Sequence, residues 1–249
     1  MKSRLLFLLL LCSLFTFSQN EAQFEQGNKH YKEGNYESAI SSWEKIIDSG
    51  VHSAELYYNL GNAYFKIESL AESIYFYEKA LQLAPGDKDI RNNLSIAQNS
   101  AIDIIEPLPK NLFKTWLDKI TQLYSYDVWA KVAVVCVLLF SLCFILYYLA
   151  KISSRKRTFF SASLILLFLA FSCMYFAFNN YDTINNQKIA IVFEKSSQVR
   201  SEPVLRSEVS FTLHEGTKVE ILDEDEDWFR VKLADGKDGW MPKGHLKKL

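Results

Sequence analysis

The residue types that most often carry catalysis or bind metals occur in this sequence, but they form no usable pattern. The five consecutive acids from Asp223 to Asp227 lie between two β-type runs. Metal-binding loops alternate their oxygen ligands with turn residues, so a solvated hairpin turn is favoured here over a cation site. The histidines are scattered without metal-ligand spacing, at His30, His52, His214 and His245. With no Gly-rich phosphate loop and no nucleophile elbow, the sequence predicts no catalytic residue, no metal site and no cofactor.

The four cysteines all fall inside apolar segments, at Cys12, Cys136, Cys143 and Cys173. Cys136 and Cys143 lie seven residues apart on one helical face. A metal site is one interpretation of that spacing, and small residues at a helix contact are the favoured one. The polar stretches have no cysteine, so they contain neither disulfides nor thiol chemistry. Such usage is consistent with an oxidising compartment.

Three apolar segments divide the chain. Residues 1–18 begin with Lys2 and Arg4 and continue with an apolar run too short for a membrane span, which is typical of a cleaved export signal. An uncleaved anchor is the alternative. Residues 132–150 and 159–178 contain no charge, proline or glycine over 19 and 20 residues, enough for helices to cross a hydrocarbon core of about 30 Å. We expect a two-helix transmembrane hairpin that acts as an anchor, because no charge within it marks an ion path.

The connecting loop "KISSRKRT", residues 151–158, predicts the orientation of this hairpin. It has no acidic residue and carries four basic ones: Lys151, Arg155, Lys156 and Arg157. Basic residues of short loops stay on the cytoplasmic side, and the outer flanks of both spans are mixed in charge. We therefore expect a two-pass membrane protein with a cytoplasmic loop and both soluble regions on the outer side.

Residues 101–131 form the linker before the first span. Aromatic residues, which favour the membrane interface, gather near its end at Trp116, Tyr124, Tyr126 and Trp129. Phe113, Trp116 and Ile120 recur at helical spacing with polar residues between them. This pattern predicts a short helix in the outer interface of the membrane. A further packing helix of the preceding domain is the other interpretation.

Between the export signal and the linker, the chain repeats with an offset of 34 residues that aligns Gly27 with Gly61. The second copy reads Tyr57-x2-Leu60-Gly61-x2-Tyr64, followed by Ala80 and Pro85. This resembles the tetratricopeptide repeat, which has this period and signature. We expect residues 20–100 to form two helical hairpins and a capping helix that starts after Asp87.

The resemblance to tetratricopeptide repeats implies a concave groove that takes peptides. By alignment, its peptide-binding candidates are Asn28, Tyr31, Lys32, Asn59, Asn62, Phe65 and Lys66. Further wall positions are Phe24, Tyr58, Asp89 and Asn93. Some repeats of this family clamp a terminal carboxylate, but Phe24 and Asp89 stand where that clamp has basic residues. For each candidate, a merely solvated polar face is the alternative.

Residues 188–249 change to short β runs separated by turn residues, with runs at 189–193, 209–213, 219–222, 229–233 and 239–241. This predicts a small all-β barrel. The phrases "FTLHEGTKVEIL" and "DWFRVKLADGKDGWMP" resemble the bacterial SH3-like domain. Trp228 and Trp240 are candidates for the floor of a ligand groove, with burial in the core as the alternative. The expected core is Val199, Leu213, Val219, Ile221, Val231, Trp240 and Leu246.

The order of export signal, repeat pair, membrane hairpin and SH3-like tail resembles the BatE family of bacterial aerotolerance-operon proteins. The phrases "AELYYNLGNAYFK", "EKALQLAPGDKDIRNNL" and "LHEGTKVEILDE" carry the resemblance. It implies a non-enzymatic scaffold in an aerotolerance or envelope stress complex. The protein would be anchored in the bacterial inner membrane by two passes, with the repeat and SH3-like domains in the periplasm. Partners would be envelope or membrane proteins, including other products of the operon, and peptidoglycan. The alternative is a regulatory or assembly subunit that acts through its hairpin in a larger membrane complex.

Nucleic acid is not an expected partner. The formal net charge of the chain is −1, and no basic segment is interleaved with aromatic residues. Such a sequence offers no electrostatic footprint for a phosphate backbone.

Overall fold

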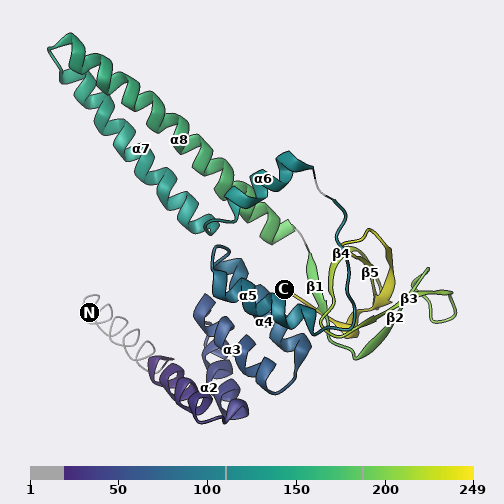
Figure 1. Cartoon of the computed structure of the whole chain (residues 1–249). Coiled ribbons are helices and arrows are strands. Elements are labelled where there is room, and N and C mark those ends of the chain that lie inside the picture. Colours follow the sequence, from purple (N-terminus) through teal and green to yellow (C-terminus); the bar gives the residue numbers. More distant parts are fainter. Residues whose placement is uncertain (1–19, 110, 187) are drawn as a thin grey trace, which may run out of the picture. The chain divides into compact units, whose positions relative to one another are not determined.

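The computed structural model describes residues 20–109, 111–186 and 188–249 (Figure 1). The expected export signal, residues 1–18, lies outside these residues. The chain divides into two compact units. The first, here called the head, contains the described residues up to 83 together with residues 87–107 and 189–249. The second, here called the hairpin unit, contains residues 84–86 and the described residues of 108–188.

The repeat region of the head consists of two helical hairpins and a capping helix, as the 34-residue period predicts. The elements are a helix over residues 20–32, α2 (Tyr36–Asp48), α3 (Ala54–Lys66), α4 (Leu70–Leu83) and α5 (Lys88–Asn99). The amino ends of α3 and α5 are capped by Ser53 and Asp87, whose side chains accept hydrogen bonds from backbone N–H groups. Such caps satisfy amide groups that have no partner within the helix.

Two glycines allow the paired helices of each repeat to approach closely. A Cβ atom on Gly27 would lie 2.2 Å from Nε1 of Trp43, and one on Gly61 would lie 2.5 Å from Cδ1 of Tyr77. Both distances are far below van der Waals contact, so these positions accept no side chain without movement of a fully buried aromatic ring. The equivalent glycines of the two repeats therefore have the same packing role.

The barrel of the head is built from seven short strands in one antiparallel sheet, in the order β3-β2-β6-β5-β4-β1-β7. The strands are β1 (Ile189–Val192), β2 (Ser196–Arg200), β3 (Val209–His214), β4 (Lys218–Asp225), β5 (Trp228–Lys232), β6 (Asp238–Pro242) and β7 (Leu246–Lys248). The sheet ends at β3 and β7, so the SH3-like barrel is not closed. Strands β2 and β7 are not predicted from the sequence because "SSQVR" and "LKK" have too few apolar residues to show a strand pattern.

The acidic run forms the expected hairpin between β4 and β5. Asp225 pairs with Trp228, which leaves a two-residue turn at Glu226 and Asp227. Glu226 has φ +41°, the left-handed conformation that such tight turns require. The five acidic residues are therefore solvent-exposed, three at the end of β4 and two in the turn.

The barrel core confirms most of the expected set but corrects one residue. Fully or nearly buried apolar side chains include five of the expected residues: Val199, Leu213, Val219, Ile221 and Val231. Trp240 is wrong as a core residue, since it is only half-buried, whereas its neighbours Gly239 and Met241 are buried. Side chains alternate between the two faces of a strand, so a shift of one residue exchanges core for surface.

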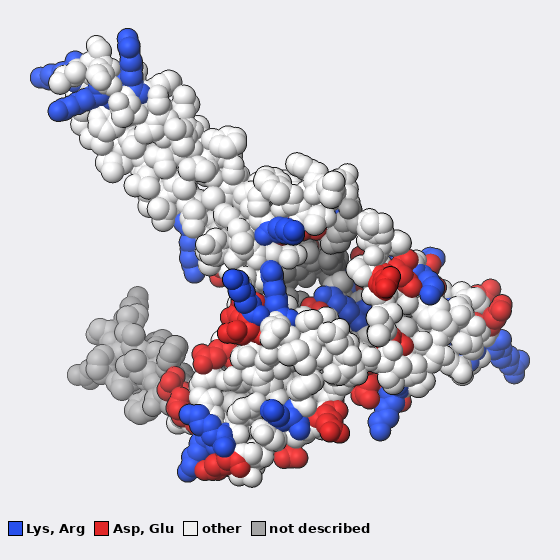
Figure 2. All heavy atoms as spheres, viewed as in Figure 1, with Lys and Arg blue, Asp and Glu red and all other residues white. Residues whose placement is uncertain are grey.

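The hairpin unit contains α6 (Leu112–Thr121), α7 (Tyr126–Leu149) and α8 (Ser153–Asn186), and all three helices are longer or placed slightly differently than predicted. The main correction concerns the expected loop 151–158, because only residues 150–152 connect α7 to α8. Its basic residues lie mostly in the first turns of α8, and Figure 2 shows blue side chains gathered at this tip. Lysine and arginine are good helix formers, so the end of an apolar run does not end the helix.

Helices α7 and α8 are long and apolar enough to cross a membrane. In their most apolar 18-residue windows, only 11% and 17% of the residues are buried. A core helix of a soluble protein would be mostly buried, and an export signal would lie near the start of the chain. The apolar surface of this pair instead faces outward over most of its length, as the uncharged sides of the hairpin in Figure 2 illustrate.

Candidate functional site

The predicted peptide groove contains a cavity of about 330 Å³ in the repeat region. Side chains from the first helix, α3, α4 and α5 line it: Tyr31, Tyr58, Asn62, Phe65, Lys66, Tyr77, Asn93 and Ile96. Four of these belong to the predicted binding set, and Tyr58 and Asn93 belong to the predicted walls. Tyr77 and Ile96 are additions that alignment to the repeat pattern does not reveal, because Tyr77 reads as an ordinary core position.

Hydrogen bonds order the polar side chains of this groove. Asn62 Oδ1 accepts hydrogen bonds from the Tyr77 hydroxyl at 2.7 Å and from Asn93 Nδ2 at 2.9 Å. Asn93 Nδ2 also donates to the Tyr58 hydroxyl at 3.0 Å. Burial raises the pKa of the Tyr77 hydroxyl, so this group remains protonated and able to donate. The network holds amide and hydroxyl groups in fixed positions on the surface of three helices.

The charge in the groove is limited to one side chain. Lys66 is the single charged residue in the lining, and it is exposed at the carboxyl end of α3. The groove therefore combines aromatic surface, amide and hydroxyl groups, and one ammonium group. This chemistry suits a peptide backbone that carries a carboxylate.

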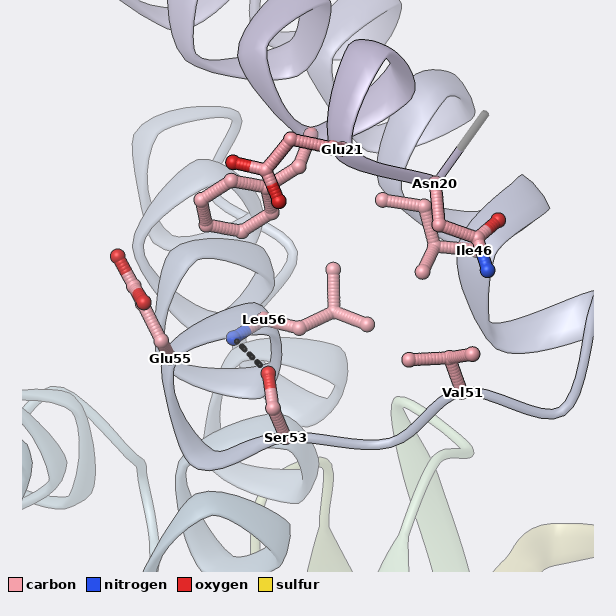
Figure 3. A pocket seen from close by; sticks show the side chains of 8 residues that line it. Asn20, Glu21, Ile46, Val51, Ser53, Glu55 and Leu56 are labelled. Carbon is pink, nitrogen blue, oxygen red and sulfur yellow. Dashed lines mark hydrogen bonds between the residues drawn. The ribbon is translucent and has the colours of Figure 1, made fainter. Parts of the chain in front are cut away.

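The remaining predicted groove residues lie outside this cavity. Asn28 and Asn59 are neighbours, with Asn59 Nδ2 3.5 Å from Asn28 Oδ1. Lys32 is exposed to solvent. Phe24 instead lines a separate cavity of about 230 Å³, in which Ile46 and Leu56 face the same hollow (Figure 3). Phe24 therefore does not line the cavity around Asn62.

The two candidate tryptophans of the barrel share its outer face. Trp240 on β6 lies opposite Arg230 on β5, and Trp228 lies two residues before Arg230 on the same strand. Both indole rings are half-buried, so the structure favours surface positions over core positions. Arg230 forms an ion pair with Asp238 at 2.6 Å, which places a charged pair beside Trp240.

The barrel is joined to the repeat region through Asp103, which lies after α5. The Asp103 carboxylate accepts hydrogen bonds from the backbone N–H of His214 at 2.6 Å and from the Thr217 hydroxyl at 2.7 Å. Its other oxygen is 2.9 Å from Nδ1 of His214. Burial alone would raise the pKa of Asp103, but the hydrogen bonds from His214 and Thr217 outweigh it and lower the pKa below its usual range. Ile105, two residues further on, packs against the barrel core.

A second connection joins α4 directly to the barrel. Lys218 Nζ at the start of β4 lies 2.8 Å from both carboxylate oxygens of Glu78, a residue that is only 8% exposed. Beside this pair, the ring of Tyr75 packs edge-on against Phe193 at 5.8 Å, and Lys247 Nζ lies 4.5 Å from the Tyr75 ring centroid. The outer side of α4 therefore carries the barrel, while the groove network lies on its other side with Tyr77.

Comparison with known families agrees with this architecture. A tetratricopeptide repeat model matches residues 24–88, and a bacterial SH3 domain model matches residues 195–247. No curated protein matches the chain. The first match covers most of the first helix and all of α2, α3 and α4, and it ends at the first residue of α5. The second covers the barrel from just before β2 to β7.

The fold and the two surfaces thus define the class of protein: a helical-repeat domain and an SH3-like domain combined with two long apolar helices. Domains of both families are typically non-catalytic and mediate protein interactions. The chain therefore has the organisation of an interaction protein.

Proposed function

We propose that this protein is a membrane-anchored interaction scaffold, held by α7 and α8, that displays its repeat groove and its SH3-like barrel on the outer face of a bacterial inner membrane. The observation that carries the proposal is the open, hydrogen-bonded groove around Asn62, which remains accessible while the barrel occupies the other side of α4. By its resemblance to the aerotolerance-operon family, the scaffold would serve an aerotolerance or envelope stress complex.

The head places a constraint on topology. Asp103 precedes the two apolar helices in sequence and His214 follows them, yet these residues form hydrogen bonds with each other. Both ends of the hairpin unit must then be on one side of any membrane that α7 and α8 cross. Two spans, rather than one or three, meet this condition.

The basic residues at the tip support a cytoplasmic position for the turn. Arg155, Lys156 and Arg157 lie at the amino end of α8, where the positive end of the helix dipole opposes cations by about 0.3–1 kcal/mol each. Helix stability therefore does not explain these residues. Retention of positive charge on the cytoplasmic side would explain them, and it supports a periplasmic head.

The expected ligand of the groove is a peptide segment of an envelope or membrane protein that includes a carboxylate. The tyrosine rings and Phe65 would contact its apolar side chains, the asparagines its backbone, and Lys66 its carboxylate. The barrel offers a second surface around Trp228 and Trp240, for which peptidoglycan peptides are the proposed ligand. Because both surfaces belong to one head, a partner that engages both gains effective concentration without any flexible tether.

Photo-crosslinking in the native membrane tests the groove. A photoreactive amino acid at Phe65 is expected to capture a partner, and the capture should be lost when Lys66→Glu is added. The matched control is the same photoreactive group at Glu37, which is exposed on α2. Equal capture from both positions, or capture unaffected by Lys66→Glu, would contradict a specific groove.

Topology is tested separately by thiol labelling in a variant without native cysteines. Cysteine at Ser210, exposed on β3, should react with a membrane-impermeant reagent once the outer membrane is permeable. Cysteine at Ser154, exposed at the tip, should react only after lysis. The reverse pattern would overturn the proposed orientation.

Exchange of residues 132–178 for an unrelated hairpin tests the alternative of a membrane-embedded subunit, because a scaffold should keep its crosslinked partner and such a subunit should lose it.

A further inference from the structure

Helix α6, just before α7, is amphipathic with an exposed apolar face. Residues on one half of its surface are apolar, namely Leu112, Phe113, Trp116, Leu117 and Ile120, and the other half carries Lys114, Thr115, Asp118 and Lys119. Phe113 and Trp116 are 68% and 57% exposed, and their rings lie 6.2 Å apart. Large aromatic side chains exposed together on one face require a covering surface.

The turn that follows α6 is fixed to the hairpin. The carbonyl of Thr121, the last residue of α6, accepts a hydrogen bond from Trp129 Nε1 of α7 at 3.0 Å. The carbonyl of Tyr124 accepts one from Nδ2 of Asn180 on α8 at 3.1 Å, and the Asn180 side chain is buried. The position of α6 along the hairpin is therefore set by bonds to both long helices.

This fixed level coincides with the end of the apolar surface. Asn180 follows the uncharged run that ends at residue 178, and Tyr181 packs edge-on against Tyr126 of α7 at 5.7 Å. The ring of Trp129 contacts those of Tyr124 and Phe176 at 5.5 and 5.0 Å. Tyrosine and tryptophan prefer the depth at which hydrocarbon gives way to headgroups. The aromatic cluster thus marks the membrane surface at the end opposite the basic tip, where α6 also lies (Figure 1).

We propose that α6 lies in the outer membrane–water interface, with Phe113 and Trp116 among the lipid acyl chains and Lys114 and Lys119 toward the headgroups and water. The inference rests on the proposed membrane anchor, because α7 and α8 provide the level to which α6 is fixed. The bonds to Trp129 and Asn180 hold α6 at the end of the exposed apolar surface of α7 and α8, so a lipid surface is the occupant that the structure favours. Interfacial helices of this composition are held by buried apolar area together with attraction to the headgroups.

Spin labels on the full-length protein in lipid bilayers test the inference, in a background without native cysteines. The three sites are Trp116→Cys on the apolar face, Lys114→Cys on the polar face as matched control, and Leu142→Cys in the middle of α7. Oxygen concentrates in lipid and a nickel chelate stays in water, so their collision rates report depth. We expect the label at 142 to be deep, that at 116 to be shallow but shielded from nickel several-fold better than that at 114, and that at 114 to be accessible to nickel.

Three other outcomes would contradict the inference, each for a different reason. If the label at position 142 is deep and the label at 116 is as accessible to nickel as the label at 114, then α6 lies in water. The inference then fails, while the membrane anchor stands. If 116 is shielded from both reagents, a protein surface covers it and the inference again fails. If the label at position 142 is itself accessible to nickel, the proposed membrane anchor fails. The inference about α6 then fails too, because it rests on that anchor. A nitroxide-lipid quenching measurement with a fluorophore at the same three sites checks that the labels have not displaced the helix.

Discussion

The head and the hairpin unit use similar apolar residues in opposite ways. In the head, Leu60 is 0% exposed and packs with Trp43 and Tyr77 among the fully buried side chains. In the hairpin unit, Leu142 is 52% exposed and most apolar side chains of α7 and α8 face outward. Long-range polar contacts differ too, because they hold together the parts of the head but gather at one end of the hairpin. This difference is the one expected if the head is built against water and the hairpin, as proposed, against lipid.

The largest expected effect separates these two surroundings directly. Leu60→Ala should lower the free energy of unfolding of the head by about 2–5 kcal/mol, because it removes buried methyl groups and leaves a cavity. Leu142→Ala should change it by less than about 0.5 kcal/mol. Hydrogen exchange of head peptides in the full-length protein, reconstituted in lipid bilayers and titrated with urea, measures both. Equal destabilisation by the two variants would break the comparison.

The next effect concerns Asp103, which joins the two domains of the head. Asp103→Ala should destabilise the head at pH 7 by about 1.5–3 kcal/mol, the range for hydrogen bonds to a charged group. Because the pKa of Asp103 is lowered in the folded head, its contribution is complete above the unfolded pKa of about 3.9 and is lost as pH falls through the folded value. The difference between wild type and variant should therefore vanish in acid.

The control for this titration is Asp89→Ala, which removes an exposed carboxylate of α5. Hydrogen exchange at several pH values should show no comparable pH-dependent difference for it. A difference for Asp103→Ala that stays constant down to strongly acidic pH would show that the carboxylate charge is not what joins the domains.

An asymmetric effect is expected at the Glu78–Lys218 pair. Lys218→Met leaves the buried carboxylate of Glu78 without its cation and should cost about 1–3 kcal/mol. Glu78→Gln should cost less, because the Lys218 side chain is 43% exposed and can be hydrated. Adding Glu78→Gln to Lys218→Met should recover part of the loss. Hydrogen exchange of β4 and α4 peptides checks this. If the two single variants lose equal stability and their losses add in the double variant, the two residues are not coupled.

The smallest effect compares two helix starts. Ser53 caps α3 with a hydrogen bond from the Leu56 N–H at 3.1 Å, whereas Ser125 precedes α7 without such a bond. Ser53→Ala should lower the stability of the head by about 0.5–2 kcal/mol, and Ser125→Ala should have little effect on exchange at the start of α7. If Ser125→Ala reduced protection at the start of α7 more than Ser53→Ala reduces it at the start of α3, capping would position α7. The surrounding lipid and the contacts of Trp129 would then not be what positions it.

Much of the fold follows from local pattern. The 34-residue period predicts the two hairpins, and the last capped helix follows from Asp87. In the candidate groove, Tyr31, Asn62, Phe65 and Lys66 line one cavity, and peptide binding by the predicted set stays a prediction. Errors arise where a pattern is short or has no clear end, as at β2 and β7, at the face of Trp240 and at the tip of the hairpin.

The sequence by itself determines the features that depend on neighbouring positions in the chain: helical period, strand alternation, uncharged apolar length and the basic tip. Tertiary structure alone decides which distant groups meet. Asp103 and His214 are separated by 111 positions, and Glu78 and Lys218 by 140. No periodicity marks an aspartate between two isoleucines as the link between two domains. Its role becomes visible only in the folded head, where the β3–β4 turn meets its carboxylate.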